Sequence, residues 1–262
     1  MNNRLLLRRM QATVNPFENS LYAFSLRDLG LGSANIVEVR RSSDNATQNF
    51  TAIEIIDGTL ESFVGALNDG FVSKWYNQNN SNFIQQLTPT NQPKIVSNGI
   101  LILLNGQPAL DFDGVNDFFQ PIQHTPTLYE TSFIWVGEIS GGDNILFSGF
   151  SQNYQLFKSG SIEIAFNNGN TLVLGNKSLI ETQSILWGNV IGLNSNFYVN
   201  NSLIQTGDPG NLGFDGLTFG GNEGSGSARA QQKVNEFIIY PLNNDTNRNS
   251  LMTNINNYYN IY

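Results

Sequence analysis

The chain has 262 residues, of which 40% are hydrophobic and 11% aromatic, so it contains enough apolar material for a substantial core. Its formal net charge is −8 with only 13 Lys and Arg residues, which argues against nucleic acid as a partner because neutralising phosphates requires clustered cations. The absence of Cys excludes disulfides and thiolate chemistry, and no apolar run approaches a membrane span, so we expect no membrane partner.

Amide side chains dominate the polar part of the sequence. Charged residues make up 13% of the chain, whereas Asn alone occurs 38 times. The usual charged share is about 25%. A surface rich in amides suits hydrogen bonding to sugars or to other subunits, and a compositionally biased genome produces the same enrichment. No shift in composition marks an internal boundary, so we expect one domain over residues 20–262 after an arm over residues 1–19.

Residues 1–19 show neither strand nor helix periodicity, and we expect an extended arm. Its apolar run is too short for a secretory signal peptide. Positive charge next to apolar side chains predicts that the arm anchors the chain to an acidic partner, such as another copy of itself. The residues expected to act in this assembly arm are Arg4, Leu5, Leu6, Leu7, Arg8, Arg9 and Met10.

The next hundred or so residues combine short helices with strands. Apolar spacing predicts a helix over residues 20–29 and another over residues 59–67, the latter capped by Thr59. Alternating apolar and polar residues predict strands over residues 36–40 and 71–76.

The pattern at residues 104–119 predicts a strand, a tight turn and a second strand. Alternation places Asp111 and Asp113 on one face and Leu110 and Phe112 on the other. An Asp-Gly pair follows, which supplies the backbone angles that a hairpin requires.

From residue 92 onward, strand patterns recur with turn signals about every eight to twelve residues, the spacing of an all-β sandwich. We therefore predict a two-sheet antiparallel jelly roll of the concanavalin-like kind, with a few short peripheral helices and a C-terminal helix over residues 245–259. Asn200 and Asn201 are placed in a hairpin turn. The core is expected to include Phe112, Trp135 and Ile238.

One group of oxygen-bearing side chains suits a hard cation. Asp111, Asp113, Asn116 and Asp117 lie close together in the sequence and could bind Ca²⁺. The competing interpretation is turn chemistry, in which Asp and Asn side chains bond neighbouring backbone amides. No other cofactor is indicated.

Several blocks taken together resemble known families. The blocks LYAFSLR (21–27), VRRSSDN (39–45), GFVSKWYNQ (70–78) and NQPKI (91–95) resemble the N-terminal half of the α-L-arabinofuranosidase B catalytic domain. The opening stretch and the ending, EFIIY (236–240) through NINNYY (254–259), resemble concanavalin-type, laminin-G-like modules of bacteriophage virion proteins. Both resemblances imply a jelly-roll sandwich.

The resemblance also implies where catalytic groups would lie, and the matched positions lack them. Retaining glycosidases need a carboxylate nucleophile and a second carboxyl group as acid and base. The segment that matches the nucleophile region, residues 146–153, contains no Asp or Glu, and the position that matches the acid/base Asp is Asn222, after Gly220 and Gly221. The family's Trp-Tyr-Asp-Gln block has Asn77 in place of Asp. From these departures we expect no catalytic residues and no enzymatic activity.

Binding residues are carried over from the same blocks. The resemblance assigns carbohydrate contacts to Trp75, Tyr76, Asn77, Gln78 and Asn222. Aromatic residues at strand positions belong to the core in the alternative interpretation.

The leading functional hypothesis is a non-enzymatic bacteriophage virion structural protein, a head or tail surface component that acts as decoration, fibre or adaptor. Its expected partners are other virion proteins and copies of itself, and its expected location is the virion, after synthesis in the host cytoplasm. One alternative is a carbohydrate-binding module for host surface glycans. A second alternative is an arabinofuranosidase-like glycoside hydrolase.

Overall fold

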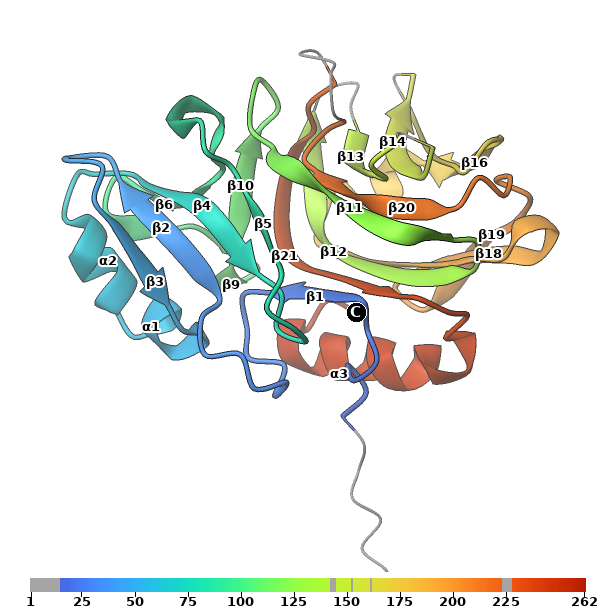
Figure 1. Cartoon of the computed structure of the whole chain (residues 1–262), viewed down its shortest axis with the longest axis horizontal. Coiled ribbons are helices and arrows are strands. Elements are labelled where there is room, and N and C mark those ends of the chain that lie inside the picture. Colours follow the sequence, from blue (N-terminus) through green and yellow to red (C-terminus); the bar gives the residue numbers. More distant parts are fainter. Residues whose placement is uncertain (1–14, 142–144, 152, 161, 223–227) are drawn as a thin grey trace, which may run out of the picture.

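The computed structural model describes residues 15–141, 145–151, 153–160, 162–222 and 228–262. Two antiparallel sheets pack face to face in this part of the chain, so the predicted sandwich is confirmed (Figure 1). The larger sheet has the order β19-β18-β17-β12-β21-β10-β6-β4-β2-β3, and its further strands β1, β5 and β7 pair with β21, β4 and β6, respectively. The smaller sheet has the order β11-β20-β13-β14-β15-β16.

The bounds of the elements are as follows. The larger sheet contains β1 (Tyr22–Ser25), β2 (Val37–Arg41), β3 (Thr47–Phe50), β4 (Gly70–Tyr76), β5 (Phe83–Gln85), β6 (Lys94–Ser97), β7 (Ile100–Leu101), β10 (Leu110–Asp113), β12 (Thr131–Gly141), β17 (Ser184–Val190), β18 (Ser195–Val199), β19 (Ser202–Gly207) and β21 (Gln231–Tyr240). The smaller sheet contains β11 (Phe119–Leu128), β13 (Ile145–Ser148), β14 (Gln155–Ser159), β15 (Glu163–Asn167), β16 (Thr171–Asn176) and β20 (Phe214–Phe219). A separate pair joins β8 (Leu103–Leu104) and β9 (Gln107–Pro108). The helices are α1 (Ala52–Ile56), α2 (Thr59–Val64) and α3 (Arg248–Tyr259), and the 3₁₀ turns are η1 (Pro89–Asn91), η2 (Lys177–Leu179), η3 (Gly192–Asn194) and η4 (Asp245–Asn247).

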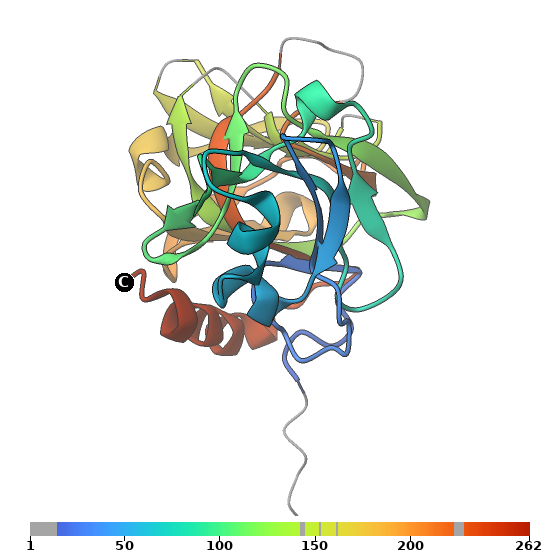
Figure 2. The same ribbon diagram turned by 90° about the vertical axis from the view of Figure 1, so that its left-hand side faces the viewer.

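The larger sheet is buried on both faces at its centre, which explains the continuous apolar runs of β12 and β21. Alternate residues of each strand enter different cores. Trp135 and Phe237 face the core between the sheets. Ile134 and Ile238 face a second core beneath α3, which lies along the lower side of the molecule in Figures 1 and 2. Phe112, Trp135 and Ile238 are all fully buried, as predicted.

Helix α3 is held to the larger sheet by a buried ion pair. The Arg27 side chain donates from Nε to Glu236 Oε2 at 2.8 Å, and the Glu236 side chain is completely buried. Ser25 Oγ and Tyr259 Oη also donate to Glu236 Oε2, at 2.9 and 3.2 Å. The Arg27 guanidinium group lies 4.8 Å from the centre of the Tyr258 ring. This cluster ties β1, β21 and α3 together.

The helix predicted over residues 20–29 is wrong. Residues 22–25 form β1, which pairs antiparallel with β21, and all four are buried. The side chains point alternately into the two cores, with Phe24 in one and Ala23 in the other. Because β1 is buried on both faces, its residues do not alternate between apolar and polar. The apolar spacing of this segment therefore resembles that of a helix.

The hairpin predicted at residues 104–119 is also wrong, although its alternation is right. Leu110 and Phe112 are buried, as expected of one face. However, β10 pairs with β21 and β6 in the larger sheet, whereas β11 pairs with β20 in the smaller sheet. The Asp-Gly turn therefore carries the chain from one sheet to the other.

The remaining expectations agree with the structure in most places. The helix near residue 59 is present as α2, but its N-cap is Gly58, at φ 91°, and not Thr59. Helix α1 was not predicted, although Thr51 and Glu54 form a capping box there. Asn200 and Asn201 form the predicted turn, at φ 49° and 63°. The C-terminal helix is confirmed as η4 followed by α3.

The assembly arm lies mostly outside the described residues. All of the residues predicted to act in the arm lie outside the described ranges, namely Arg4, Leu5, Leu6, Leu7, Arg8, Arg9 and Met10. The described end of the expected arm packs against the domain, since Phe17 is buried in the core beneath α3 and Tyr240 Oη donates to Pro16 O at 3.0 Å. No helix in the described ranges is long and apolar enough to cross a bilayer.

Candidate functional site

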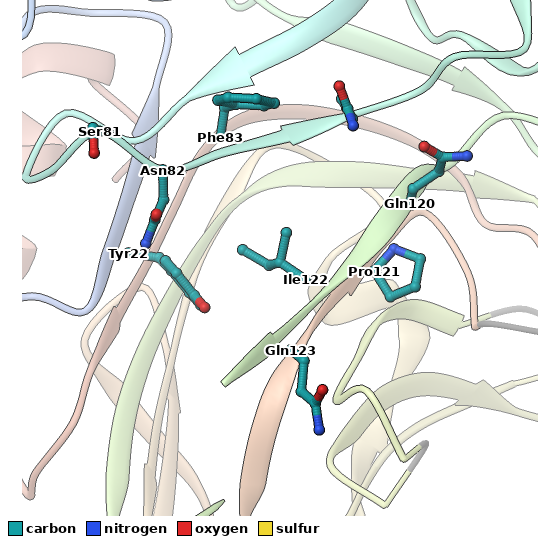
Figure 3. Close-up of a pocket in the computed structure, with 9 residues that line it drawn as sticks. Tyr22, Ser81, Asn82, Phe83, Gln120, Pro121, Ile122 and Gln123 are labelled. Carbon is teal, nitrogen blue, oxygen red and sulfur yellow. The ribbon is translucent and has the colours of Figure 1, made fainter. Parts of the chain in front are cut away.

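A polar groove opens between residues of β5 and β11, beside Tyr22 of β1 (Figure 3). Its volume is about 410 Å³. Its walls come from three distant parts of the chain, which the sandwich brings together. The lining residues are Tyr22, Ser81, Asn82, Phe83, Gln85, Gln120, Pro121, Ile122 and Gln123. We call this cavity the amide groove, because four of these side chains are carboxamides.

The carboxamides of the amide groove have no protein partner. Among the described residues, no hydrogen bond is made by the side chains of Asn82, Gln85, Gln120 or Gln123. Asn77, by contrast, is a buried amide with a protein partner, since its Oδ1 accepts from Ala23 N at 2.8 Å. Free carboxamides each offer two donors and an acceptor, so the groove presents both kinds of group to a ligand.

Tyr22 provides a fixed hydroxyl at the side of the groove. Its ring is packed in the core between the sheets, 6.2 Å from Phe214 and 5.7 Å from Phe24 between ring centres. Only 2% of the residue is exposed, and in Figure 3 its oxygen lies toward Ile122 and Gln123. No residue in the described part of the chain hydrogen-bonds to this hydroxyl. Burial raises the pKa of Tyr22 to about 12, so the group stays protonated at neutral pH.

An aromatic and apolar wall completes the amide groove. Phe83 is partly exposed and meets Tyr76 edge to face at 5.8 Å. Pro121 and Ile122, from β11, lie across from it (Figure 3). The lining therefore combines apolar faces with free amides and contains no charged side chain. This combination suits saccharides, whose rings present C–H faces and hydroxyl groups.

The residues that the resemblance assigned to sugar contacts lie mainly in structural positions. Trp75 is fully buried, 5.5 Å from Phe24, and cannot stack on a ligand in this conformation. Asn77 is buried and bonds the backbone of residue 23. Gln78 is buried as well, and its Oε1 accepts from Leu29 N at 2.8 Å. Tyr76 is partly exposed, and its hydroxyl donates to Asn49 Oδ1 at 2.9 Å.

Asn222 follows β20 and is 8% exposed. Its backbone oxygen accepts from Arg229 Nη1 at 3.0 Å. The Arg229 guanidinium group stacks over Phe118, at 3.9 Å from the ring centre. Neither Asn222 nor any of residues 75–78 lines the amide groove.

In the Asp-rich turn at residues 113–117, side-chain carboxylates accept hydrogen bonds from backbone amides of the same turn. Asp113 Oδ1 accepts from the backbone amides of Val115, Asn116 and Asp117, at 2.8, 3.1 and 3.3 Å. Asp117 Oδ2 accepts from Asp113 N at 3.0 Å. Asp111 is half-buried on β10, and its charge interacts with those of Asp113 and Asp117. Within the described part of the chain, no three His, Asp or Glu side chains could hold a metal ion together. These contacts favour turn chemistry over the Ca²⁺ interpretation.

Asp117 should make stability depend on pH. Burial raises the pKa of its carboxyl group to about 7, from an ordinary value of 3.8. The folded state therefore binds a proton more tightly than the unfolded state, so Asp117 makes the protein less stable as pH rises from about 4 to about 7. We expect Asp117→Asn to remove this contribution. Urea unfolding at a series of pH values measures this contribution. An equal fall in stability between about pH 4 and pH 7 in the wild type and in Asp117→Asn would contradict the expectation.

Comparison with known proteins identifies the fold. No known family profile and no curated protein matches the sequence. A GH54 α-L-arabinofuranosidase soaked with a cyclic sulfate inhibitor has a TM-score of 0.68 at 15% identity, over 90% of this chain and 62% of that one. An arabinofuranosidase complexed with arabinofuranosyl-α-1,2-xylobiose has a TM-score of 0.61 at 15% identity, with the same coverage. Trypanosoma rangeli sialidase in complex with sialic acid has a TM-score of 0.51 at 12% identity, over 85% of this chain and 33% of that one.

These likenesses correct the expectation that the chain is not an enzyme. That expectation depended on carboxylates missing from three matched places, residues 146–153, Asn222 and Asn77. The arabinofuranosidases and the sialidase named above share this fold, so the fold gives no ground for excluding activity. This chain spans less than two thirds of the length of the arabinofuranosidases it resembles. The fold is thus an arabinofuranosidase-like β-sandwich.

Proposed function

We propose that the protein binds saccharides in the amide groove. One observation carries the proposal: four carboxamides and a buried tyrosine hydroxyl line one cavity, and none of them has a protein partner in the described residues. Polar groups at a protein surface are normally satisfied by water, which a ligand with hydroxyl groups can replace at little cost. Phe83 and Pro121 supply apolar faces for sugar rings.

The biological setting that fits this activity is a bacteriophage virion. In this proposal the chain is a surface component that attaches to host glycans, together with other virion proteins and copies of itself. Its support is the resemblance of residues 236–240 and 254–259 to virion modules, and the amide-rich composition.

The test is a glycan array probed with the wild-type chain and with a Gln120→Ala/Gln123→Ala variant. Each lost hydrogen bond costs about 0.5 to 1.5 kcal/mol, so the double variant should bind roughly 5- to 150-fold more weakly to every glycan that the wild type binds. Gln48→Ala is the matched control, since Gln48 is an exposed amide on β3, outside the groove. Unchanged binding by the double variant would overturn the groove as the site.

Glycoside hydrolysis is the second candidate, and Asp117 favours it. A buried carboxyl group with a pKa near 7 has the property of a general acid, and Asp113 supplies another carboxylate in the same turn. The same protein preparations can be assayed with 4-nitrophenyl α-L-arabinofuranoside. Turnover that Asp117→Asn abolishes would support this candidate, whereas turnover unaffected by that change would exclude Asp117.

A further inference from the structure

Resting on the proposed function, we infer that the amide groove selects uncharged saccharides and that the Tyr22 hydroxyl, by bonding one sugar hydroxyl directly, discriminates among them. Two independent features of the groove support the inference. The first is the charge of its lining, and the second is the rigidity of Tyr22.

The lining of the amide groove has no charged side chain that could pair with an ionised ligand. None of the nine lining residues is charged. Lys74 Nζ lies 5.5 Å from the centre of the Phe83 ring at the apolar wall, and this cation is already paired with Glu38 at 3.1 Å. The whole chain carries a formal charge of −8. A carboxylate or sulfate in this groove would lose hydration without gaining a counter-charge, so acidic sugars should be disfavoured.

Tyr22 is suited to discriminate because it cannot move away. Its backbone pairs with Ile239 of β21, and its ring is enclosed by aromatic neighbours. The carboxamides of Gln120 and Gln123, by contrast, are on partly and largely exposed side chains that can rotate. A ligand without a hydroxyl at the matching position would leave the Tyr22 oxygen shielded from water and unbonded. Sites of that kind discriminate strongly.

The experiment compares wild type and Tyr22→Phe on neutral xylo-, cello- and galacto-oligosaccharides, and on oligogalacturonates and sialylated oligosaccharides of matched length. The change removes one oxygen and keeps the ring, so the melting temperature should stay the same. Affinity for the neutral ligand that binds best should fall roughly tenfold. Tyr129→Phe is the matched control, because Tyr129 is exposed and outside the groove.

The outcomes separate the two levels of the proposal. If the wild-type chain binds none of the glycans, saccharide binding itself fails. If it binds neutral glycans but Tyr22→Phe binds them equally well, the role of Tyr22 is wrong. If acidic glycans bind as tightly as neutral ones of the same length, the inferred selectivity is wrong, while saccharide binding stands.

Discussion

Replacing Arg27 with Ala is expected to lower the free energy of unfolding by about 3 to 5 kcal/mol. The reason is that Glu236 lies fully buried on β21 and would lose the cation that compensates its charge. Arg27 also donates to Asn254 Oδ1 at 3.0 Å and stacks on Tyr258, so the change would loosen α3 as well. Chemical denaturation followed by circular dichroism measures the effect.

The matched control is the double change Arg27→Met with Glu236→Leu. Replacing a buried ion pair by apolar residues of similar size is often neutral or stabilising, whereas removing one partner is costly. We therefore expect the double variant to be more stable than Arg27→Ala. The account of this cluster would be contradicted by a cost below about 1 kcal/mol for Arg27→Ala, the magnitude of an exposed ion pair.

Trp75→Ala is the second change with a large expected effect, about 3 to 5 kcal/mol of lost stability. The Trp75 ring lies in the core between the sheets, 6.0 Å from Phe219 and 6.3 Å from Phe119 between ring centres. Its Nε1 has no hydrogen-bond partner among the described residues, so no polar interaction is lost with it. Thermal and urea unfolding of the purified variant measure the loss.

Trp75→Phe is the matched comparison, because it keeps an aromatic ring and leaves a smaller cavity. It should cost clearly less than the change to Ala. A Trp75→Ala protein that unfolds like the wild type but loses glycan binding would contradict the core assignment and restore the sugar-contact hypothesis for this residue.

Much of the fold could be predicted from the sequence because most strands have one face in a core. β18 shows this alternation, and the Asn200-Asn201 turn that follows it agrees with the prediction. The failures have a common physical cause in long-range pairing. β1 is buried on both faces, so its pattern imitates a helix, and the local turn at Asp113 gives no sign that β10 and β11 join different sheets.

The candidate site could not be predicted in the same way. The amide groove is made of residues from β1, from β5 and the loop before it, and from β11, which meet only through the folded sandwich. The only local signal was the Gln-Pro-Ile-Gln run at residues 120–123, and such a run is unremarkable in an amide-rich chain. Conversely, Trp75 and Gln78 resembled a binding block but are used for packing and for bonding the backbone.

The most direct test of saccharide binding in the amide groove is a nuclear magnetic resonance titration of the side-chain amides with the neutral oligosaccharides named above. We expect the shifted signals to be those of Asn82, Gln85, Gln120 and Gln123, with little change at the buried, bonded amides of Asn77 and Gln78. Shifts centred instead on residues 75–78 or on the Asp113–Asp117 turn, or no shifts with any saccharide, would contradict the account.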